Sequence, residues 1–160
     1  MNSKLLRTCL VSGTILLAAL LWFTRTEYFP SLSAFANAQN QIFYNSMHIV
    51  ASWFFIMNGA KRNNNLDYWV GFGMGGILLT NMYTYPMAHN IVTAATLGLA
   101  VFNIIYSSRN FERIVSIFLG TTAIIVFLVG YLTDMHFLLA EVIAMACVAI
   151  GMIRSIWVKN

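Results

Sequence analysis

Charged residues are scarce in this sequence. They make up 9% of its 160 residues, whereas hydrophobic residues make up 59%. So few charged side chains cannot cover the surface of a soluble globular protein, and disorder requires the opposite combination of low hydrophobicity and high net charge. A separate soluble domain is also missing, because the longest connection between apolar segments spans only residues 24–40. The composition predicts an all-α polytopic membrane protein.

Cysteine and proline are rare as well, with two residues of each. Cys9 lies near one end of the first apolar segment and Cys147 near the middle of the last one. Their depths in a membrane therefore differ, and we expect no disulfide. Pro86 follows the third apolar segment and is expected to end that helix or to cap the turn into the next one.

Six apolar segments are long enough to be considered as membrane spans. A helix needs roughly 20 residues to cross ~30 Å of hydrocarbon. We expect a single six-helix transmembrane domain over residues 1–160, folded as one compact bundle, so that any site lies inside the bundle or on its rims. The predicted spans are at about 5–23, 41–59, 68–84, 88–107, 114–133 and 137–158.

The basic residues predict the orientation of these spans. With six spans, Arg25 alone falls on one side of the membrane and all other basic residues fall on the opposite side. The positive-inside rule then places both termini in the cytoplasm, and we expect a multi-pass protein of a bacterial inner membrane. The formal charge of +4 follows from this topology, so membrane lipids are the expected partners and nucleic acid is not. The residues on the cytoplasmic side are Lys4, Arg7, Lys61, Arg62, Arg109, Arg113, Arg154 and Lys159.

The first span resembles a signal peptide in part. Lys4 and Arg7 precede its apolar stretch, and residues 36–38 (Ala-Asn-Ala) look like a cleavage site. The apolar core ends at Phe23, however, which is much farther from that site than signal peptides normally allow. We therefore expect the first span to be retained.

Small residues indicate how the helices pack. Gly71 and Gly75 form a Gly-x-x-x-Gly pattern in the third span. Such faces let helix backbones approach closely in a membrane, either within the bundle or in a homo-oligomer. A dinucleotide-binding loop is not expected, because no strand precedes these glycines.

Polar residues inside the spans mark the candidate site, because such residues are costly in a membrane. In the second span Gln41, Asn45, His48 and Ser52 share one helical stripe. The predicted topology places the three histidines and the carboxylates Asp134 and Glu141 in the outer half of the bundle. The inner half is expected to hold only Asn58, Asn103 and hydroxyl groups. The sequence thus predicts a hydrated pocket open to the outside, whose candidate ligand-binding residues are Asn45, His48, Asn81, His89, Thr93 and Glu141.

Several uses of this pocket stay open. The polar side chains can join the helices by hydrogen bonds, or they can bind a lipid head group or small ligand. Three imidazoles and a carboxylate would also suit a catalytic zinc, with His48, His89 and His136 as weak candidate ligands. No two of these histidines share a helix, so the pattern does not favour a metal, and no cofactor or catalytic residue is predicted. Glu141 is the one carboxylate well inside a span, and it can alternatively couple proton binding to the transport of a small molecule.

Scattered positions along nearly the whole chain carry a family resemblance. They are residues 30–35 (Pro-Ser-Leu-Ser-Ala-Phe), residues 61–65 (Lys-Arg-Asn-Asn-Asn), His89, Glu141 and Gly151. On these residues the chain resembles a bacterial family of uncharacterised six-span membrane proteins, which is distantly similar to the Frag/DRAM/Sfk group of eukaryotic membrane proteins.

This resemblance implies a pair formed by His89 and Glu141, with residues 30–35, including Pro30 and Ser33, as a cover over the pocket. It also implies a lipid-related role. The chain departs from the family at residues 39–41 (Gln-Asn-Gln), where the family has an arginine, and at His48, which has no counterpart there. The expected function is therefore a non-enzymatic membrane protein that binds a lipid head group or small ligand. A proton-coupled transporter that uses Glu141 is the alternative, and a zinc-dependent membrane hydrolase comes third.

Overall fold

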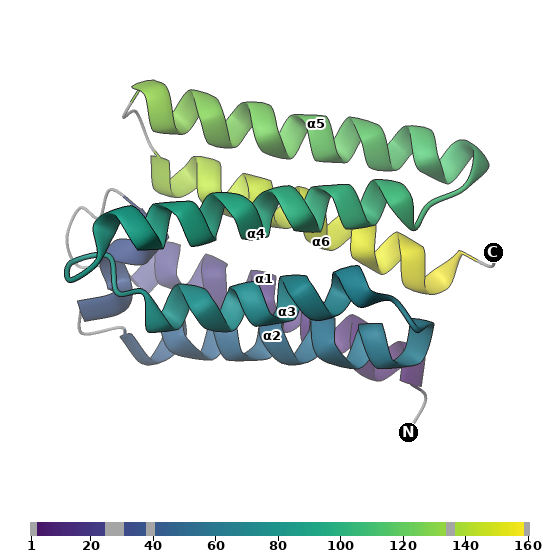
Figure 1. Cartoon of the computed structure of the whole chain (residues 1–160), viewed down its shortest axis with the longest axis horizontal. Coiled ribbons are helices and arrows are strands. Elements are labelled where there is room, and N and C mark those ends of the chain that lie inside the picture. Colours follow the sequence, from purple (N-terminus) through teal and green to yellow (C-terminus); the bar gives the residue numbers. More distant parts are fainter. Residues whose placement is uncertain (1–2, 25–30, 38–40, 134–136, 159–160) are drawn as a thin grey trace.

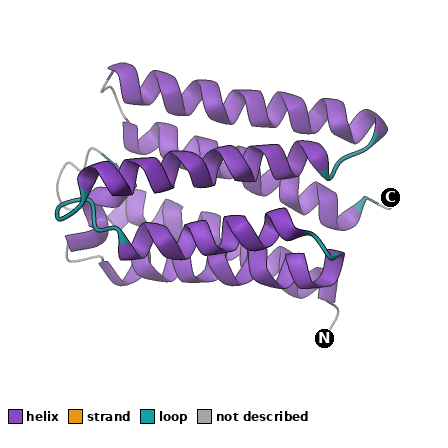
Figure 2. Ribbon diagram, viewed as in Figure 1, coloured by secondary structure: helices purple, strands orange, loops and turns teal. Residues whose placement is uncertain are grey.

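The computed structural model describes residues 3–24, 31–37, 41–133 and 137–158. Within these residues the chain forms six α-helices and one short 3-10 helix, and no strand (Figure 2). The helices are α1 (Ser3–Thr24), η1 (Leu32–Asn37), α2 (Gln41–Arg62), α3 (Asn65–Leu79), α4 (Pro86–Tyr106), α5 (Asn110–Thr133) and α6 (Phe137–Trp157).

The six long helices form one up-and-down bundle. Each packs against its neighbours in the chain, and α6 also packs against α1 and α4 (Figure 1). The beginning of α1 and the end of α6 lie at the same end of the bundle, which we call the termini end. The short helix η1 lies at the opposite end, which we call the cover end.

Four helices, α1, α4, α5 and α6, are long and apolar enough to cross a membrane. Their outward faces carry large apolar side chains. Phe118 on α5 is 70% exposed, and Leu132 near the end of the same helix is 78% exposed. A continuous apolar exterior of this kind is stable against lipid and not against water. The protein is therefore a polytopic membrane protein.

The third helix differs from the predicted span 68–84. Helix α3 begins three residues earlier, at Asn65, and ends at Leu79. Thr80 caps the end of α3, and the Thr80 amide donates to the Gly76 carbonyl. The chain then turns, because the side-chain oxygen of Asn81 accepts the amide of Tyr83. With 15 residues, α3 is shorter than the roughly 20 residues that a full crossing needs.

The turn between α2 and α3 follows from the run of asparagines. Asn63 adopts a left-handed conformation (φ 50°), and the amide of Asn64 bonds to the Gly59 carbonyl at 3.1 Å. This is the Schellman ending of a helix, for which asparagine is suited. The Asn64 side chain then caps α3 by accepting the amide of Leu66 at 3.1 Å. The next helix therefore starts immediately, and α2 and α3 lie antiparallel.

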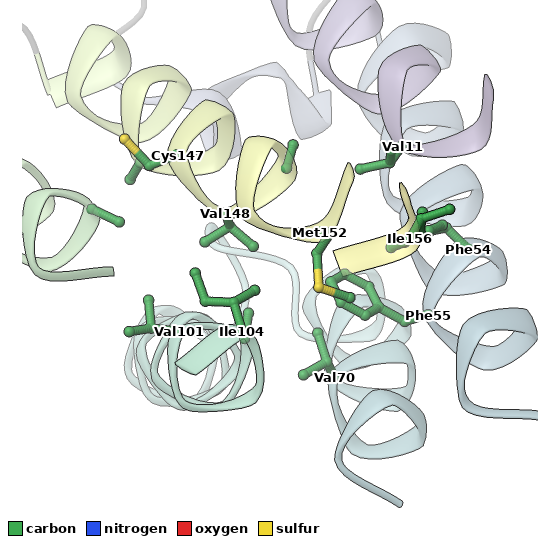
Figure 3. Packing of buried hydrophobic residues seen from close by; sticks show 14 residues of the cluster. Val11, Phe54, Phe55, Val70, Val101, Ile104, Cys147, Val148, Met152 and Ile156 are labelled. Carbon is green, nitrogen blue, oxygen red and sulfur yellow. The ribbon is translucent and has the colours of Figure 1, made fainter. Parts of the chain in front are cut away.

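Two apolar clusters form the interior of the bundle. The larger one lies in the middle and towards the termini end, where Ile104 of α4 and Met152 of α6 meet Phe55 of α2 (Figure 3). The second lies at the cover end and is centred on Phe35 of η1, which is completely buried against Leu21 and other residues of α1, α2 and α6. This second cluster attaches η1 to the bundle.

The two glycines of the Gly-x-x-x-Gly pattern have different surroundings. A Cβ atom on Gly71 would lie 2.8 Å from Ile56 Cγ1 and 3.1 Å from the Ser52 carbonyl oxygen of α2. The Ser52 hydroxyl also donates to the Gly71 carbonyl at 2.8 Å. In the described part of the chain, no atom lies within 4 Å of a Cβ on Gly75, which borders a shallow apolar hollow beside Trp53. Gly71 thus serves packing within the chain, whereas Gly75 remains accessible.

Candidate functional site

A short buried segment lies over the cover end of the bundle. We call residues 31–37, which include η1, the cover segment. Residues 31–36 are all buried, although most of them are small or polar. Phe35 anchors the segment in the apolar cluster at this end, and its burial places the polar groups of Leu32 and Ser33 against α4 and α6.

Glu141 of α6 bonds to the beginning of the cover segment. Its Oε2 accepts the backbone amide of Leu32 at 2.6 Å. Leu32 is the first residue of η1, so its amide has no partner within that helix. The carboxylate therefore caps η1, while the Glu141 side chain also lines a cavity beneath it.

His89 of α4 joins the cover segment to the turn between α3 and α4. Its Nε2 lies 2.7 Å from Ser33 Oγ, and its Nδ1 lies 2.5 Å from the Thr80 carbonyl oxygen. A carbonyl can only accept a hydrogen bond, so Nδ1 carries the proton and Nε2 accepts the hydroxyl proton of Ser33. The Thr80 carbonyl thereby determines both the tautomer and the orientation of the imidazole.

His48 of α2 is oriented by its own helix. Its Nδ1 lies 3.0 Å from the Tyr44 carbonyl oxygen, and the two rings are in contact with centroids 4.5 Å apart. The same reasoning assigns the proton to Nδ1 and leaves Nε2 as an acceptor. Tyr44 also packs with Phe35 of the cover segment in the apolar cluster at this end. The cover segment is thus bound to α2, α4 and α6.

A cavity of about 100 Å³ lies beneath the cover segment. Its lining is mainly apolar and comes from all six long helices, including Met74, Leu97 and Val148. The polar groups Ser33, His48 and Glu141 also line it. The cavity therefore has the character of a site for an apolar molecule with a few hydrogen-bonding atoms.

Thr93 contributes an unusual polar atom to this cavity. Its Oγ1 is buried and has no hydrogen-bond partner among the residues that the structure describes. Thr93 lies one turn after His89 on α4 and lines the cavity. A buried hydroxyl without a partner is destabilising by itself, and an ordered water or a ligand would satisfy it.

The structure brings together some of the predicted site residues. His48, Thr93 and Glu141 line the cavity, and His89 reaches it through Ser33. Asn45 is only partly buried on α2, and Asn81 forms the turn after α3, where its side chain accepts the amide of Tyr83. Neither of these two asparagines lines the cavity.

The three side chains expected around a hydrated pocket are buried within the protein. Glu141 is 8% exposed, His48 is 7% exposed and His89 is 2% exposed. Glu141 and His89 bond to backbone and hydroxyl groups of the cover segment, which lies over them.

The metal hypothesis receives no ligand set from the structure. Within the described ranges, no group of three His, Cys, Asp or Glu side chains is placed to hold a metal ion. His136 and Asp134 lie outside the described residues, as does Pro30.

The prediction for the inner half of the bundle was wrong. Asp67 is completely buried near the termini end, where the amides of Asn58 and Asn103 donate to its two carboxylate oxygens at 3.0 and 2.7 Å. Arg7 Nη1 donates to the side-chain oxygen of Asn58 at 2.7 Å. Asn64 Nδ2 donates to the side-chain oxygen of Asn103 at 2.8 Å. We call these five residues the inner network.

Sequence reasoning missed this network because it placed Asp67 in a loop before the third span. Helix α3 starts at Asn65, so Asp67 lies in its first turn and faces α2 and α4. The available signal was the asparagine run before Asp67, which is typical of a helix start, together with two asparagines inside apolar spans.

Comparison of the chain with protein-family models, curated proteins and solved structures gives no match. The function of the candidate site is therefore inferred from its geometry.

Proposed function

We propose that this polytopic membrane protein binds a small amphiphile in the cavity beneath the cover segment. The observation that carries the proposal is a mainly apolar cavity of about 100 Å³ lined by Thr93, whose buried hydroxyl has no hydrogen-bond partner among the described residues. The apolar part of the ligand would contact side chains such as Met74 and Leu97, and its polar group would bond to Thr93 near Glu141.

The size of the cavity limits the ligand. A cavity of ~150 Å³ holds a molecule the size of benzene. The present cavity is smaller and accommodates a short acyl or alkyl group, not a complete phospholipid. We therefore propose a short-chain lipid fragment or a comparable small molecule, which is consistent with the lipid-related role that the family resemblance implies.

We also propose that the bundle crosses the inner membrane six times with both termini in the cytoplasm. Two observations support this topology. The beginning of α1 and the end of α6 lie at the same end of the bundle, and α2 and α3 run alongside the four apolar helices. The excess of basic residues at this end agrees with the positive-inside rule.

Photoaffinity labelling tests the ligand proposal. The probe is a short-chain alkyl ester that carries a diazirine at the end of its chain, added to the purified protein in detergent. We expect cross-links on cavity residues such as Leu97 of α4, found by peptide mass spectrometry. Thr93→Val keeps the shape of the side chain but removes the hydroxyl, so it should reduce labelling about tenfold, as expected for loss of one buried hydrogen bond.

Thr133→Val is the matched control. Thr133 is exposed near the end of α5, and among the residues that the structure describes its hydroxyl bonds only to the Val129 carbonyl of its own helix. This variant should label like the wild type. Cross-links scattered over the lipid-facing surface, with no effect of Thr93→Val, would contradict the proposal.

A further inference from the structure

We propose that Ser33 and His89 form a nucleophile and general-base pair that cleaves or transfers a small acyl ester bound in the cavity. The pair is assembled from the cover segment and α4, which are far apart in the sequence. This inference rests on the proposed function, because the acyl group of the ester must occupy the cavity described above.

The first support is the geometry of the pair. Ser33 Oγ lies 2.7 Å from His89 Nε2, and His89 Nδ1 lies 2.5 Å from the Thr80 carbonyl oxygen. A nucleophile hydrogen-bonded to a base, which is itself oriented by a third group, is the arrangement that activates serine in covalent catalysis. Here a backbone carbonyl takes the place of the usual carboxylate.

The second support is the position of the hydroxyl relative to the cavity. Ser33 lines the cavity, whereas His89 is not among the lining residues and is 2% exposed. The Ser33–His89 hydrogen bond therefore lies at the edge of the cavity. A purely structural hydrogen bond between the cover segment and α4 does not require the serine to face a cavity.

The third support is the Thr93 hydroxyl. Its Oγ1 has no partner among the described residues, and it lines the same cavity as Ser33. It lies four residues after His89 and hence on the same face of α4. The hydroxyl oxygen itself is shielded from the cavity, so a rotation about the Thr93 Cα–Cβ bond is needed to turn it inward. After that rotation it can bond to the negatively charged oxygen that develops when a serine attacks a carbonyl group.

The reaction balances with an ester and water as the only reactants. Ser33 Oγ forms a bond to the acyl carbon while its proton moves to His89 Nε2. The ester C–O bond then breaks, and His89 returns this proton to the departing alcohol. Water attacks the acyl-serine while His89 accepts one of its protons. The bond between the acyl carbon and Ser33 Oγ then breaks, His89 returns this proton to Ser33 Oγ, and the acid leaves. A second alcohol in place of water would give acyl transfer.

The test uses a short-chain alkyl fluorophosphonate on the full-length protein in detergent, followed by intact mass and peptide mapping. Ser33 Oγ attacks phosphorus and fluoride leaves, so a stable adduct forms. We expect one adduct per chain, located on Ser33 and lost in Ser33→Ala. His89→Gln should slow its formation at least ~100-fold, because glutamine cannot accept the proton.

Ser31→Ala is the matched control, because Ser31 is also buried in the cover segment but hydrogen-bonds to the sulfur of Met82 instead of an imidazole. This variant should form the adduct at the wild-type rate. Thermal unfolding reports whether each variant is folded. If Ser33→Ala does not fold, Ser33→Cys is used in its place. In this variant the fluorophosphonate adduct at residue 33 should be lost, and iodoacetamide should alkylate the new thiol at residue 33.

The diazirine ester separates the failure of this inference from that of the proposed function. Cross-links in the cavity without any fluorophosphonate adduct on Ser33 would overturn the catalytic pair and leave ligand binding intact. An adduct that persists in Ser33→Ala would also overturn it. The absence of both cross-links and adduct would overturn the two proposals together.

Discussion

Glu141 and Leu32 are 109 positions apart in the chain, yet the Glu141 carboxylate accepts the Leu32 backbone amide at 2.6 Å. This bond connects α6 to the first residue of η1, and it lies directly above the cavity. The position of the cover segment therefore depends on a residue that itself lines the proposed ligand site. We therefore expect a ligand that bonds to Glu141 to compete with the Leu32 amide for this carboxylate.

The Glu141 contact predicts how substitutions affect the cover segment. Glu141→Gln retains an oxygen that can accept the Leu32 amide, so protection of residues 31–37 from proteolysis should change little. Glu141→Leu leaves that amide without a partner, which costs about 1–3 kcal/mol, and should increase the rate of cleavage there. Limited proteolysis with peptide mapping measures both rates. Equal protection in the two variants would show that the carboxylate does not hold the segment.

The inner network predicts a strong effect of Asp67 on stability. Asp67→Ala removes the acceptor of two buried amide groups, of Asn58 and Asn103, and should lower the free energy of unfolding by about 3 kcal/mol. Denaturation in mixed micelles measures this change. Glu112→Ala is a suitable comparison, because Glu112 pairs with the partly exposed Arg154 at 2.7 Å, and its loss should have little effect. Similar losses in both variants would contradict the importance of the buried network.

The two glycines of α3 predict opposite outcomes. Gly71→Val places atoms against Ile56 and the Ser52 backbone, so it should destabilise the α2–α3 pair by about 1–3 kcal/mol. Gly75→Val meets no atom within 4 Å and should leave the stability of a single chain unchanged. Size-exclusion chromatography with light scattering then shows whether Gly75 belongs to an interface between copies. If Gly75→Val changes the oligomeric state and Gly71→Val does not, the homo-oligomer expected from the Gly-x-x-x-Gly pattern is supported. A monomeric wild-type protein would contradict that expectation.

The proposed topology predicts different accessibility at the two ends of the bundle. In a background with Cys9→Ser and Cys147→Ala, Thr84→Cys introduces a thiol in the exposed turn at the cover end, and Arg109→Cys introduces one in the turn at the termini end. A membrane-impermeant maleimide should label Thr84→Cys in cells whose outer membrane alone is permeabilised. Arg109→Cys should require disruption of the inner membrane as well. The reverse pattern would invert the orientation, and equal labelling would contradict the six-span arrangement.

Much of the bundle could be predicted from the pattern of apolar segments. All six predicted spans overlap a helix, because long apolar runs between short polar connections leave the chain few alternatives in lipid. The third span shows where this reasoning fails. Tyr83 and Thr84 extend the apolar and hydroxyl-bearing run, but the local bonds of Thr80 and Asn81 end α3 earlier.

The candidate site could be predicted only in part. His48, Thr93 and Glu141 were identifiable because polar groups are rare inside apolar helices, and they line one cavity. Ser33 entered only through the family resemblance, because a serine in a polar connection carries no signal of its own. Asp67 escaped notice for a related reason, since a carboxylate beside a loop is normally solvated.

The sequence by itself determined that this chain is helical, apolar and suited to a membrane, because composition and segment length depend on nothing beyond the chain. Only the tertiary structure decided which polar groups meet. The pairs formed by Ser33 with His89, Leu32 with Glu141 and Asn103 with Asp67 join residues from different elements. Each pair exists because burial in an apolar bundle leaves a polar group no other partner, and the choice of partner is made by packing over long distances in the chain.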